Sequence, residues 1–152
     1  MTVSVRLESG SFEPPAELAE LTRCAARDGA VVSFVGIARR VSKAGEGLET
    51  LVLEHHPCLT ERSLRDIASD AASRFEVSHV RVVHRCGEIR PGEPIVFAGA
   101  AASHRRAAFE AADYLMDRLK TEAVFWKREE GASGSRWIEP TEADYADRGR
   151  WE

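Results

Sequence analysis

The chain has 152 residues, 43% of them hydrophobic and 30% charged, which predicts one domain with a single core. Its formal net charge of −4 argues against binding dominated by nucleic-acid phosphates, which needs a basic excess. Because no apolar run approaches the roughly 20 residues that span a bilayer, and the N-terminus lacks a signal-peptide pattern, we expect a cytoplasmic protein with no membrane or nucleic-acid partner.

The chain begins with a predicted strand and a predicted helix. Residues 2–8 alternate apolar and polar side chains, the period-2 pattern of a strand with one buried face. A helix is expected over 15–28, because two prolines stand at its start and apolar residues recur on one face. Gly29 can take the left-handed conformation that ends such a helix.

Two strands are predicted on either side of an exposed loop. Residues 30–38 are nearly all apolar, typical of a buried central strand, and Gly36 indicates close approach to a neighbouring segment. Residues 39–48 carry basic side chains and glycines without periodicity, typical of an exposed loop beside a site. The second strand is expected over 49–56.

The middle of the chain predicts a helix followed by two paired strands. The helix covers 60–75, with Thr60 as its N-cap and apolar residues on one face. Strands are expected over 77–86 and 94–101. The turn sequence RPGE at 90–93 lies between them and favours antiparallel pairing.

The C-terminal part predicts a third helix and two short strands. Ser103 is the expected N-cap of a helix over 104–120. AVFWKRE and RWIE form the strands, and EGASGS connects them. We assign 1–139 to a single domain and 140–152 to a polar tail whose order the composition leaves open.

The order of these elements predicts an α+β fold. Strands arrive in pairs between helices, without the strict alternation of a parallel sheet. We expect a two-layer α/β sandwich in which three main helices pack on a largely antiparallel sheet. No G-x-G-x-x-G or Walker-type loop points to a nucleotide.

Cysteine and histidine spacing predicts neither a metal site nor a cofactor. Cys24, Cys58 and Cys86 are widely spaced and without a C-x-x-C pair, so we expect buried, reduced thiols rather than a nucleophile. His55 and His56 would point to opposite faces of a strand and cannot easily share one metal.

A basic cluster, SHRR at 103–106, stands at the start of the third helix. His104 and Arg105 would lie in the first turn, where free N–H groups and the helix dipole attract an anion. The alternative is a solvated basic cluster. Because cations at a helix N-terminus oppose the dipole, we favour an anion site.

Two lysines stand around an apolar pair of residues. Lys120 ends the third helix, and Lys127 follows Phe125 and Trp126 on the next strand. A lysine beside bulky apolar groups loses solvation, so its pKa falls and it can transfer protons or act as a nucleophile. Two exposed, solubilising lysines are the alternative, and the residues alone leave both open.

The third helix separates the two basic groups. Fifteen residues lie between Arg105 and Lys120, which is roughly 22 Å on a straight helix. One small ligand cannot contact both. If both groups serve one site, two copies of the chain must share it, so we predict a homodimer with composite sites.

Six segments stand in order over roughly residues 28–139: DGAVVSFVGIAR, LEHHPCLTE, HRCGEIRPGE, IVFAGAAASHRRAAFEA, MDRLKTEAVFWKRE and RWIE. Together they resemble the large, catalytic subunit of molybdopterin synthase. The resemblance implies a cytoplasmic sulfurtransferase of molybdenum cofactor biosynthesis that makes the molybdopterin dithiolene from cyclic pyranopterin monophosphate. It also implies that a small ubiquitin-like subunit brings the sulfur as a C-terminal thiocarboxylate, in a heterotetramer around a large-subunit homodimer.

The resemblance implies catalytic roles for Lys120, near the incoming glycine tail, and for Lys127. It implies substrate contacts for seven further residues: Ile37, Ala38, Arg39, Arg128, Glu129 and, from the opposite protomer, His104 and Arg105. The chain departs from the family pattern at His56, Ala38, Cys86 and Val124. Ala38 and Val124 stand near Arg39 and Lys127, and none of the four departures removes a charged group from the site.

Two other function classes compete with the sulfurtransferase. A non-catalytic module would use the same basic groups only to dock a ubiquitin-like tail or an anionic metabolite. The lysine pair argues against it, because docking does not need both lysines around an apolar segment. A zinc or phosphoryl-transfer enzyme lacks ligand spacing and a phosphate loop.

Overall fold

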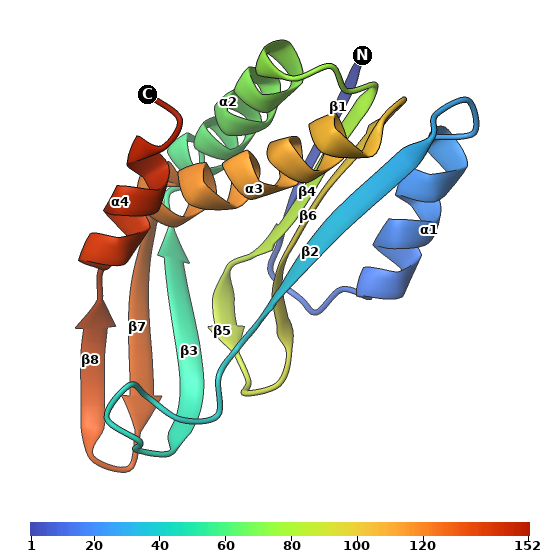
Figure 1. The fold of residues 1–152 in the computed structure, drawn as a ribbon. Coiled ribbons are helices and arrows are strands. Elements are labelled where there is room, and N and C mark those ends of the chain that lie inside the picture. The colour runs from blue at the N-terminus through green and yellow to red at the C-terminus, as the bar shows by residue number, and fades with distance from the viewer.

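The computed structural model describes all 152 residues and contains eight strands and four helices (Figure 1). In chain order these are β1 (Thr2–Glu8), α1 (Pro14–Cys24), β2 (Ala30–Ile37), β3 (Leu48–His55), α2 (Leu59–Arg74), β4 (His79–Arg85), β5 (Gly87–Ile89), β6 (Pro94–Ala102), α3 (Arg105–Glu122), β7 (Phe125–Gly131), β8 (Gly134–Ile138) and α4 (Glu142–Gly149). The predicted α+β class is confirmed.

The strands form two sheets of four, in the orders β1-β4-β6-β2 and β5-β3-β7-β8. Every pair is antiparallel except β1 with β4. The chain passes directly from β4 of the first sheet to β5 of the second between Arg85 and Gly87, and the positive φ of Gly87 (80°) allows the sharp change of direction. The predicted antiparallel pairing of β4 with β6 is confirmed, and β5 lies between them in the chain.

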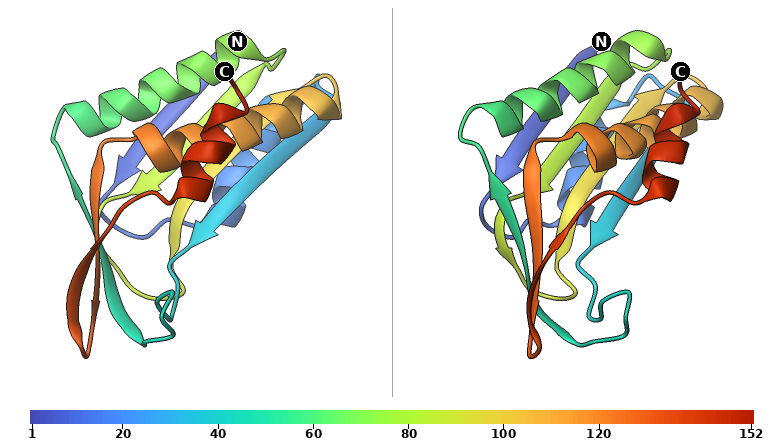
Figure 2. Two further views of the ribbon diagram at one scale, coloured as in Figure 1. Left: turned by 60° about the vertical axis from the view of Figure 1, so that its left-hand side comes forward. Right: turned by 90° about the vertical axis from the view of Figure 1, so that its left-hand side faces the viewer.

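Helices cover both faces of the first sheet. α2 and α3 lie on one face and α1 on the other, while the second sheet extends away from this helical layer (Figures 1 and 2). The larger core cluster joins Leu64 of α2 and Leu115 of α3 to Val80 of β4, and all three are fully buried or nearly so. Burying one such side chain contributes about 1.5–3 kcal/mol.

α1 is held to the sheet by a half-buried ion pair network as well as by a small core. Its Glu17 carboxylate accepts hydrogen bonds from Arg81 of β4 and Arg6 of β1, each at 2.8 Å. Burial works against the charged carboxylate, but the bonds from both guanidinium groups lower the pKa of Glu17 below its usual value. Leu21 packs under the helix against Phe97.

Two features predicted around β2 are wrong. α1 ends at Cys24, where the Ala25 amide bonds to the Leu21 and Thr22 carbonyls, so Gly29 does not cap it. Gly29 instead donates its amide to the Ala102 carbonyl and opens β2. β2 itself is an edge strand rather than a central one. Its apolar run is explained by helices that cover both of its faces.

The predicted N-caps of α2 and α3 are also wrong. His56 supplies the cap contacts of α2, because its Nδ1 accepts from the Cys58 and Leu59 amides. Thr60 is buried and donates to the Val124 carbonyl at 2.6 Å, which ties α2 to the strand that follows α3. The N-cap of α3 is His104, with no side-chain cap bond.

The polar C-terminal stretch contains a capped helix. Thr141 accepts from the Asp144 amide, and the Asp144 carboxylate accepts from the Thr141 amide, so the two form a capping box at the start of α4. α4 packs on α3 (Figure 1). The composition alone does not decide whether this segment is ordered.

The prediction of three buried cysteines holds only for Cys86. Cys24 is half-buried on α1 and Cys58 is exposed at the start of α2. Burial raises the pKa of the Cys86 thiol. None of the four helices has the length and hydropathy needed to cross a membrane.

Gly29 provides a test of how α3 is held against β2. A Cβ at this position would lie 2.4 Å from the Ser103 carbonyl oxygen, which is backbone and cannot rotate away. We expect Gly29→Ala to lower the free energy of unfolding by about 1–3 kcal/mol, as overpacking does. Urea denaturation measures this. Gly10→Ala is the matched control, since nothing lies within 4 Å of its Cβ; equal losses in both variants would contradict the close approach.

Candidate active site

Lys127 lies on β7 in the middle of the second sheet. It pairs with Leu53 of β3 on one side and Ile138 of β8 on the other. Because side chains alternate along a strand, Lys127 and Glu129 share one face and Arg128 points to the opposite one. Phe125, on the same face as Lys127, stacks on His84 of β4 with ring centroids 4.3 Å apart. The Lys127 side chain is half-buried on this face.

Burial and like charge lower the pKa of Lys127 from its ordinary 10.5 to about 8. Loss of solvation is the largest cause, followed by the positive charge of Lys120 and, more weakly, that of Arg39. The Glu129 carboxylate opposes this shift. Four charged groups from α3, the β2–β3 loop and β7 thus act on one another, and a substantial fraction of Lys127 is neutral near pH 8.

The three lysines of the chain gather in this region. Lys120 is exposed in the last turn of α3, and its charge acts on both Lys127 and Asp144 of α4. Burial would raise the pKa of Asp144, but bonds from Thr141 and the charges of Lys120 and Lys43 lower it below its usual value. Every ion pair of the structure is formed by arginine, so the lysine ammonium groups remain free for a ligand.

Sequence reasoning missed Asp144 and Lys43 as members of this cluster. Asp144 stands in the stretch expected to be a polar tail, and no local pattern connects it to Lys120. Lys43 lies in the loop over residues 39–48. The basic side chains of that loop and its lack of periodicity are the sequence signal that points to it.

The start of the β2–β3 loop is fixed by the RPGE turn. The Ala38 amide donates to the Glu93 carbonyl at 2.9 Å, and the Gly92 amide donates to the Ala38 carbonyl at 2.8 Å. Ala38 is 2% exposed and packs in a small cluster with residues of β3 and β5. Ile37 and Arg39 on either side of it are exposed. Arg39 is therefore presented from a rigid support.

Arg128 and Glu129 lie on opposite faces of the second sheet. Arg128 bonds to Glu54 at 2.8 Å and to Glu130 at 3.0 Å, and its guanidinium lies 5.2 Å from the Trp137 ring centroid. The structure therefore does not bring Arg128 to the lysines, although it neighbours Lys127 in sequence. Glu129 is on the lysine face.

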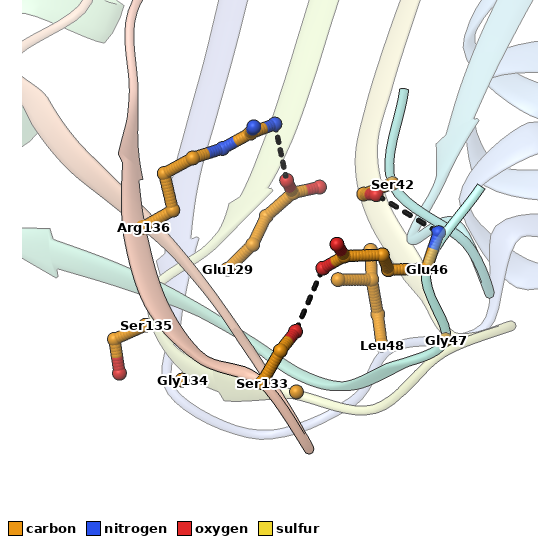
Figure 3. Close-up of a pocket in the computed structure, with 10 residues that line it drawn as sticks. Ser42, Glu46, Gly47, Leu48, Glu129, Ser133, Gly134, Ser135 and Arg136 are labelled. Carbon is orange, nitrogen blue, oxygen red and sulfur yellow. Dashed lines mark hydrogen bonds and ion pairs between the residues drawn. The ribbon is translucent and has the colours of Figure 1, made fainter. Parts of the chain in front are cut away.

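A polar pocket lies beside Glu129, between the β2–β3 loop and the β7–β8 turn (Figure 3). Ser133 donates to the Glu46 carboxylate at 2.7 Å and so links the turn to the loop. Arg136 pairs with Glu129 at 3.8 Å. The pocket contains neither Lys120 nor Lys127.

His104 and Arg105 lie at the far end of α3 from the lysines. Both side chains are exposed, and the first turn contains no acidic residue. They are thus free to hold an anion with the positive end of the helix dipole. α3 is continuous over the whole distance, so one copy of the chain does not bring them to Lys120.

His84 lies beside Lys127, and it is neutral. It is buried, its Nδ1–H donates to the Arg85 carbonyl at 2.8 Å, and burial together with the charge of Lys127 lowers its pKa to about 4. It supports Phe125 rather than binding metal. No group of three histidine, cysteine or acidic side chains is placed to hold a metal ion.

The charge cluster predicts opposite shifts in the pKa of Lys127 for two substitutions. Lys120→Met should raise it toward 10.5 by removing a like charge, and Glu129→Gln should lower it by removing an opposite one. NMR titration of methylated protein measures this, and three lysines give few signals. Arg62→Met, which removes an exposed cation of α2, is the control and should leave the pKa in place. Shifts of the same sign in the two site variants would contradict the cluster.

Comparison with known proteins gives a family for this arrangement. The model of the MoaE protein family matches residues 9–122. The chain is 48% identical to the molybdopterin synthase catalytic subunit of Caulobacter vibrioides over 97% of both chains. Among solved structures it is similar to the molybdopterin biosynthesis MoaE protein of Burkholderia ambifaria, with a TM-score of 0.82, 37% identity, and 98% of this chain and 97% of that chain covered.

A more distant solved structure has the same fold. It is the protein–protein complex of subunits 1 and 2 of molybdopterin-converting factor from Helicobacter pylori, with a TM-score of 0.72, 19% identity, and 91% of this chain and 90% of that chain covered. The match to the family model covers most of the chain, and the identity to the Caulobacter protein extends over nearly its full length. The chain therefore belongs to the MoaE family.

Proposed function

We propose that the chain is the catalytic subunit of molybdopterin synthase, a sulfurtransferase. It transfers sulfur from the C-terminal thiocarboxylate of a small ubiquitin-like subunit to cyclic pyranopterin monophosphate, which gives the dithiolene of molybdopterin. The observation that carries this proposal is the lysine cluster: Lys127, with a pKa near 8, beside Lys120 and Arg39, in a chain 48% identical to a named catalytic subunit.

The two lysines suit different parts of such a transfer. In such a transfer the thiocarboxylate sulfur bonds to a substrate carbon in place of an oxygen that leaves as water, and a second water then attacks the resulting thioester carbon, which leaves the sulfur on the substrate and a carboxylate on the small subunit. Negative charge develops on the thioester oxygen during that attack, and a fixed cation such as Lys120 stabilises it. Lys127 titrates near neutral pH, so it can give and take protons during the reaction. The sulfur comes from the partner, so the reaction needs no cysteine of this chain. Its one buried thiol, Cys86, has a raised pKa and suits packing rather than attack.

The small subunit reaches this site with its terminal glycine. The cationic cluster attracts the anionic tail, and the exposed position of Lys120 leaves it accessible. The Helicobacter pylori protein of the same fold was solved with a second subunit, which supports a two-subunit enzyme here. Residues 1–139 form the catalytic domain in this proposal, and the 140–152 segment adds Asp144 beside Lys120. We expect the enzyme in the cytoplasm.

The substrate phosphate requires a second copy of the chain. His104 and Arg105 are exposed and face no acidic group in their turn, but α3 holds them roughly 22 Å from Lys120. In a homodimer within the heterotetramer, these two residues of one protomer hold the substrate beside the lysines of the other, with Glu129 and the Ile37–Arg39 segment as further contacts. Arg128 contributes from the opposite face by fixing the strand.

Lys120→Ala distinguishes an enzyme from a docking module. Removing a group that acts on the reacting atoms should lower the rate of dithiolene formation about 10²–10⁴-fold, while affinity for the small subunit changes little. The assay mixes the chain with thiocarboxylated small subunit and cyclic pyranopterin monophosphate and quantifies the product. Calorimetry measures the affinity.

Arg62→Ala on α2 is the control for both readouts and should leave them near wild type. If Lys120→Ala instead lowers affinity and product in parallel, the chain is a docking module that uses its cations only to bind.

Composite sites predict that two inactive variants rescue each other. Lys120→Ala and Arg105→Ala damage different halves of each site, so a mixed dimer keeps one of its two sites intact. After exchange of subunits at equal amounts, half of the dimers are mixed, and product formation should return to about a quarter of wild type. Activity no higher than the mean of the separate variants would contradict a shared site.

A further inference from the structure

A junction of two residues, Ala123 and Val124, connects α3 to β7 and separates the two lysines of the site. Lys120 lies in the last turn of α3, just before this junction. Lys127 is the third residue of β7, just after it. The spacing of the two ammonium groups therefore depends on the geometry of the junction.

The backbone of the chain supports this junction only weakly. Ala123 is extended (φ −67°, ψ 137°), and no backbone bond caps the end of α3. The Phe125 amide donates to the Ala123 carbonyl at 3.0 Å, which makes a three-residue turn centred on Val124. Val124 itself makes no hydrogen bond to another backbone group. A helix end without a cap frays, and the like charges of Lys120 and Lys127 favour their separation.

Two hydroxyl groups of α2 bind both backbone polar groups of Val124. The Thr60 hydroxyl donates to the Val124 carbonyl at 2.6 Å, and the Ser63 hydroxyl accepts from the Val124 amide at 3.0 Å. Ser63 in turn donates to the Thr60 carbonyl at 2.7 Å, while Thr60 accepts from the His56 amide at 2.8 Å. Each hydroxyl thus donates once and accepts once. We call Thr60, Ser63 and Val124 the hydroxyl clamp.

The hydroxyl clamp is sheltered from water and stands on a fixed support. Thr60 is fully buried and Ser63 is half-buried. A buried hydrogen bond that breaks leaves its partners unsatisfied, so the bound geometry is strongly preferred. Leu64 and Ile67 anchor α2 in the larger core cluster independently of the clamp. The clamp therefore constrains Val124 rather than α2.

We propose that Thr60 and Ser63 are positioning residues of the active site, which fix Lys120 relative to Lys127 by binding both peptide groups of Val124. The inference deepens the proposed function, on which its consequence for the reaction rests. Both hydroxyl groups are engaged with backbone atoms. They act through the lysines and not on the substrate.

The charged groups that act on Lys127 come from four segments: Lys120 of α3, Arg39 of the β2–β3 loop, Glu129 of β7 and Asp144 of α4, while His84 of β4 faces it as a neutral ring. Lys120 belongs to the helix that ends at the clamped junction. When the clamp opens, repulsion moves Lys120 away from Lys127. Glu129 stays two residues from Lys127 on the same strand. The proposal therefore predicts that one charge interaction is lost and the other is kept.

Ser63→Ala tests the clamp through the interaction between the two lysines. Alone it should raise the pKa of Lys127 from about 8 toward 10.5, because the like charge moves away. In this background Lys120→Met should shift that pKa by less than about half of its effect in wild type, whereas Glu129→Gln should shift it equally in both. NMR titration of methylated protein, below the unfolding temperature, measures all of these shifts.

Three further variants complete this test. Ser69→Ala, at an exposed position of the same helix, should leave the effect of Lys120→Met at its wild-type size. Ser63→Thr keeps a hydroxyl and should restore it. Thr60→Val removes the other hydroxyl of the clamp with little change of shape and should act like Ser63→Ala. A wild-type effect of Lys120→Met in both the Ser63→Ala and the Thr60→Val proteins overturns the proposal.

The enzyme assay tests whether the spacing matters to the reaction. Ser63→Ala should lower the rate of dithiolene formation at saturating substrate about 10–10²-fold, as a small displacement of a catalytic group does, with KM nearly unchanged. Ser63→Thr should recover most of the rate. Full activity in a Ser63→Ala protein whose lysine interaction is lost overturns the positioning role. The pKa measurement uses neither substrate nor small subunit, so failure of the clamp and failure of the proposed reaction appear in different experiments.

Discussion

The site depends on keeping one ammonium group partly out of water beside other cations. Lys127 loses solvation on β7 and also feels the charges of Lys120 and Arg39, so its charged form is disfavoured. A flexible strand would relax and let the group move into solvent. The second sheet prevents this, because β7 is hydrogen-bonded on both sides and its Phe125 stacks on the buried His84. The hydrogen bonds and packing of β7 therefore keep the pKa of Lys127 low.

The charged groups of the cluster come from α3, the β2–β3 loop, β7 and α4, and each of these segments is fixed separately. Thr60 ties α2 to the start of β7 through the Val124 carbonyl. The RPGE turn holds Ala38 and so presents Arg39. The capping box at Thr141 begins α4, which packs on α3 and brings Asp144 to Lys120. Local hydrogen bonds of about 0.5–1.5 kcal/mol each position charges that would otherwise separate.

α3 and β2 give the molecule its length scale. Both are continuous and nearly equal in span, with His104 and Arg105 near one end and Lys120 and Arg39 near the other. A single copy therefore does not bring the two ends of α3 to one small ligand. The structure carries protective charges or short length on its other edge strands and leaves β2 apolar.

The sequence by itself determined the positions of nearly all strands and the three main helices, the α+β class and the family, because hydrophobic periodicity and residue identity are local. It also located the lysine pair and the separate basic cluster at 103–106. Only the tertiary structure decided that β2 is an edge strand, that Lys120 and Arg39 act on Lys127, and that Asp144 lies beside Lys120. Those outcomes depend on which strands pair and which helix covers which face. Contacts between segments far apart in the sequence decide the strand pairing and the helix placement. The local residue pattern does not predict these contacts.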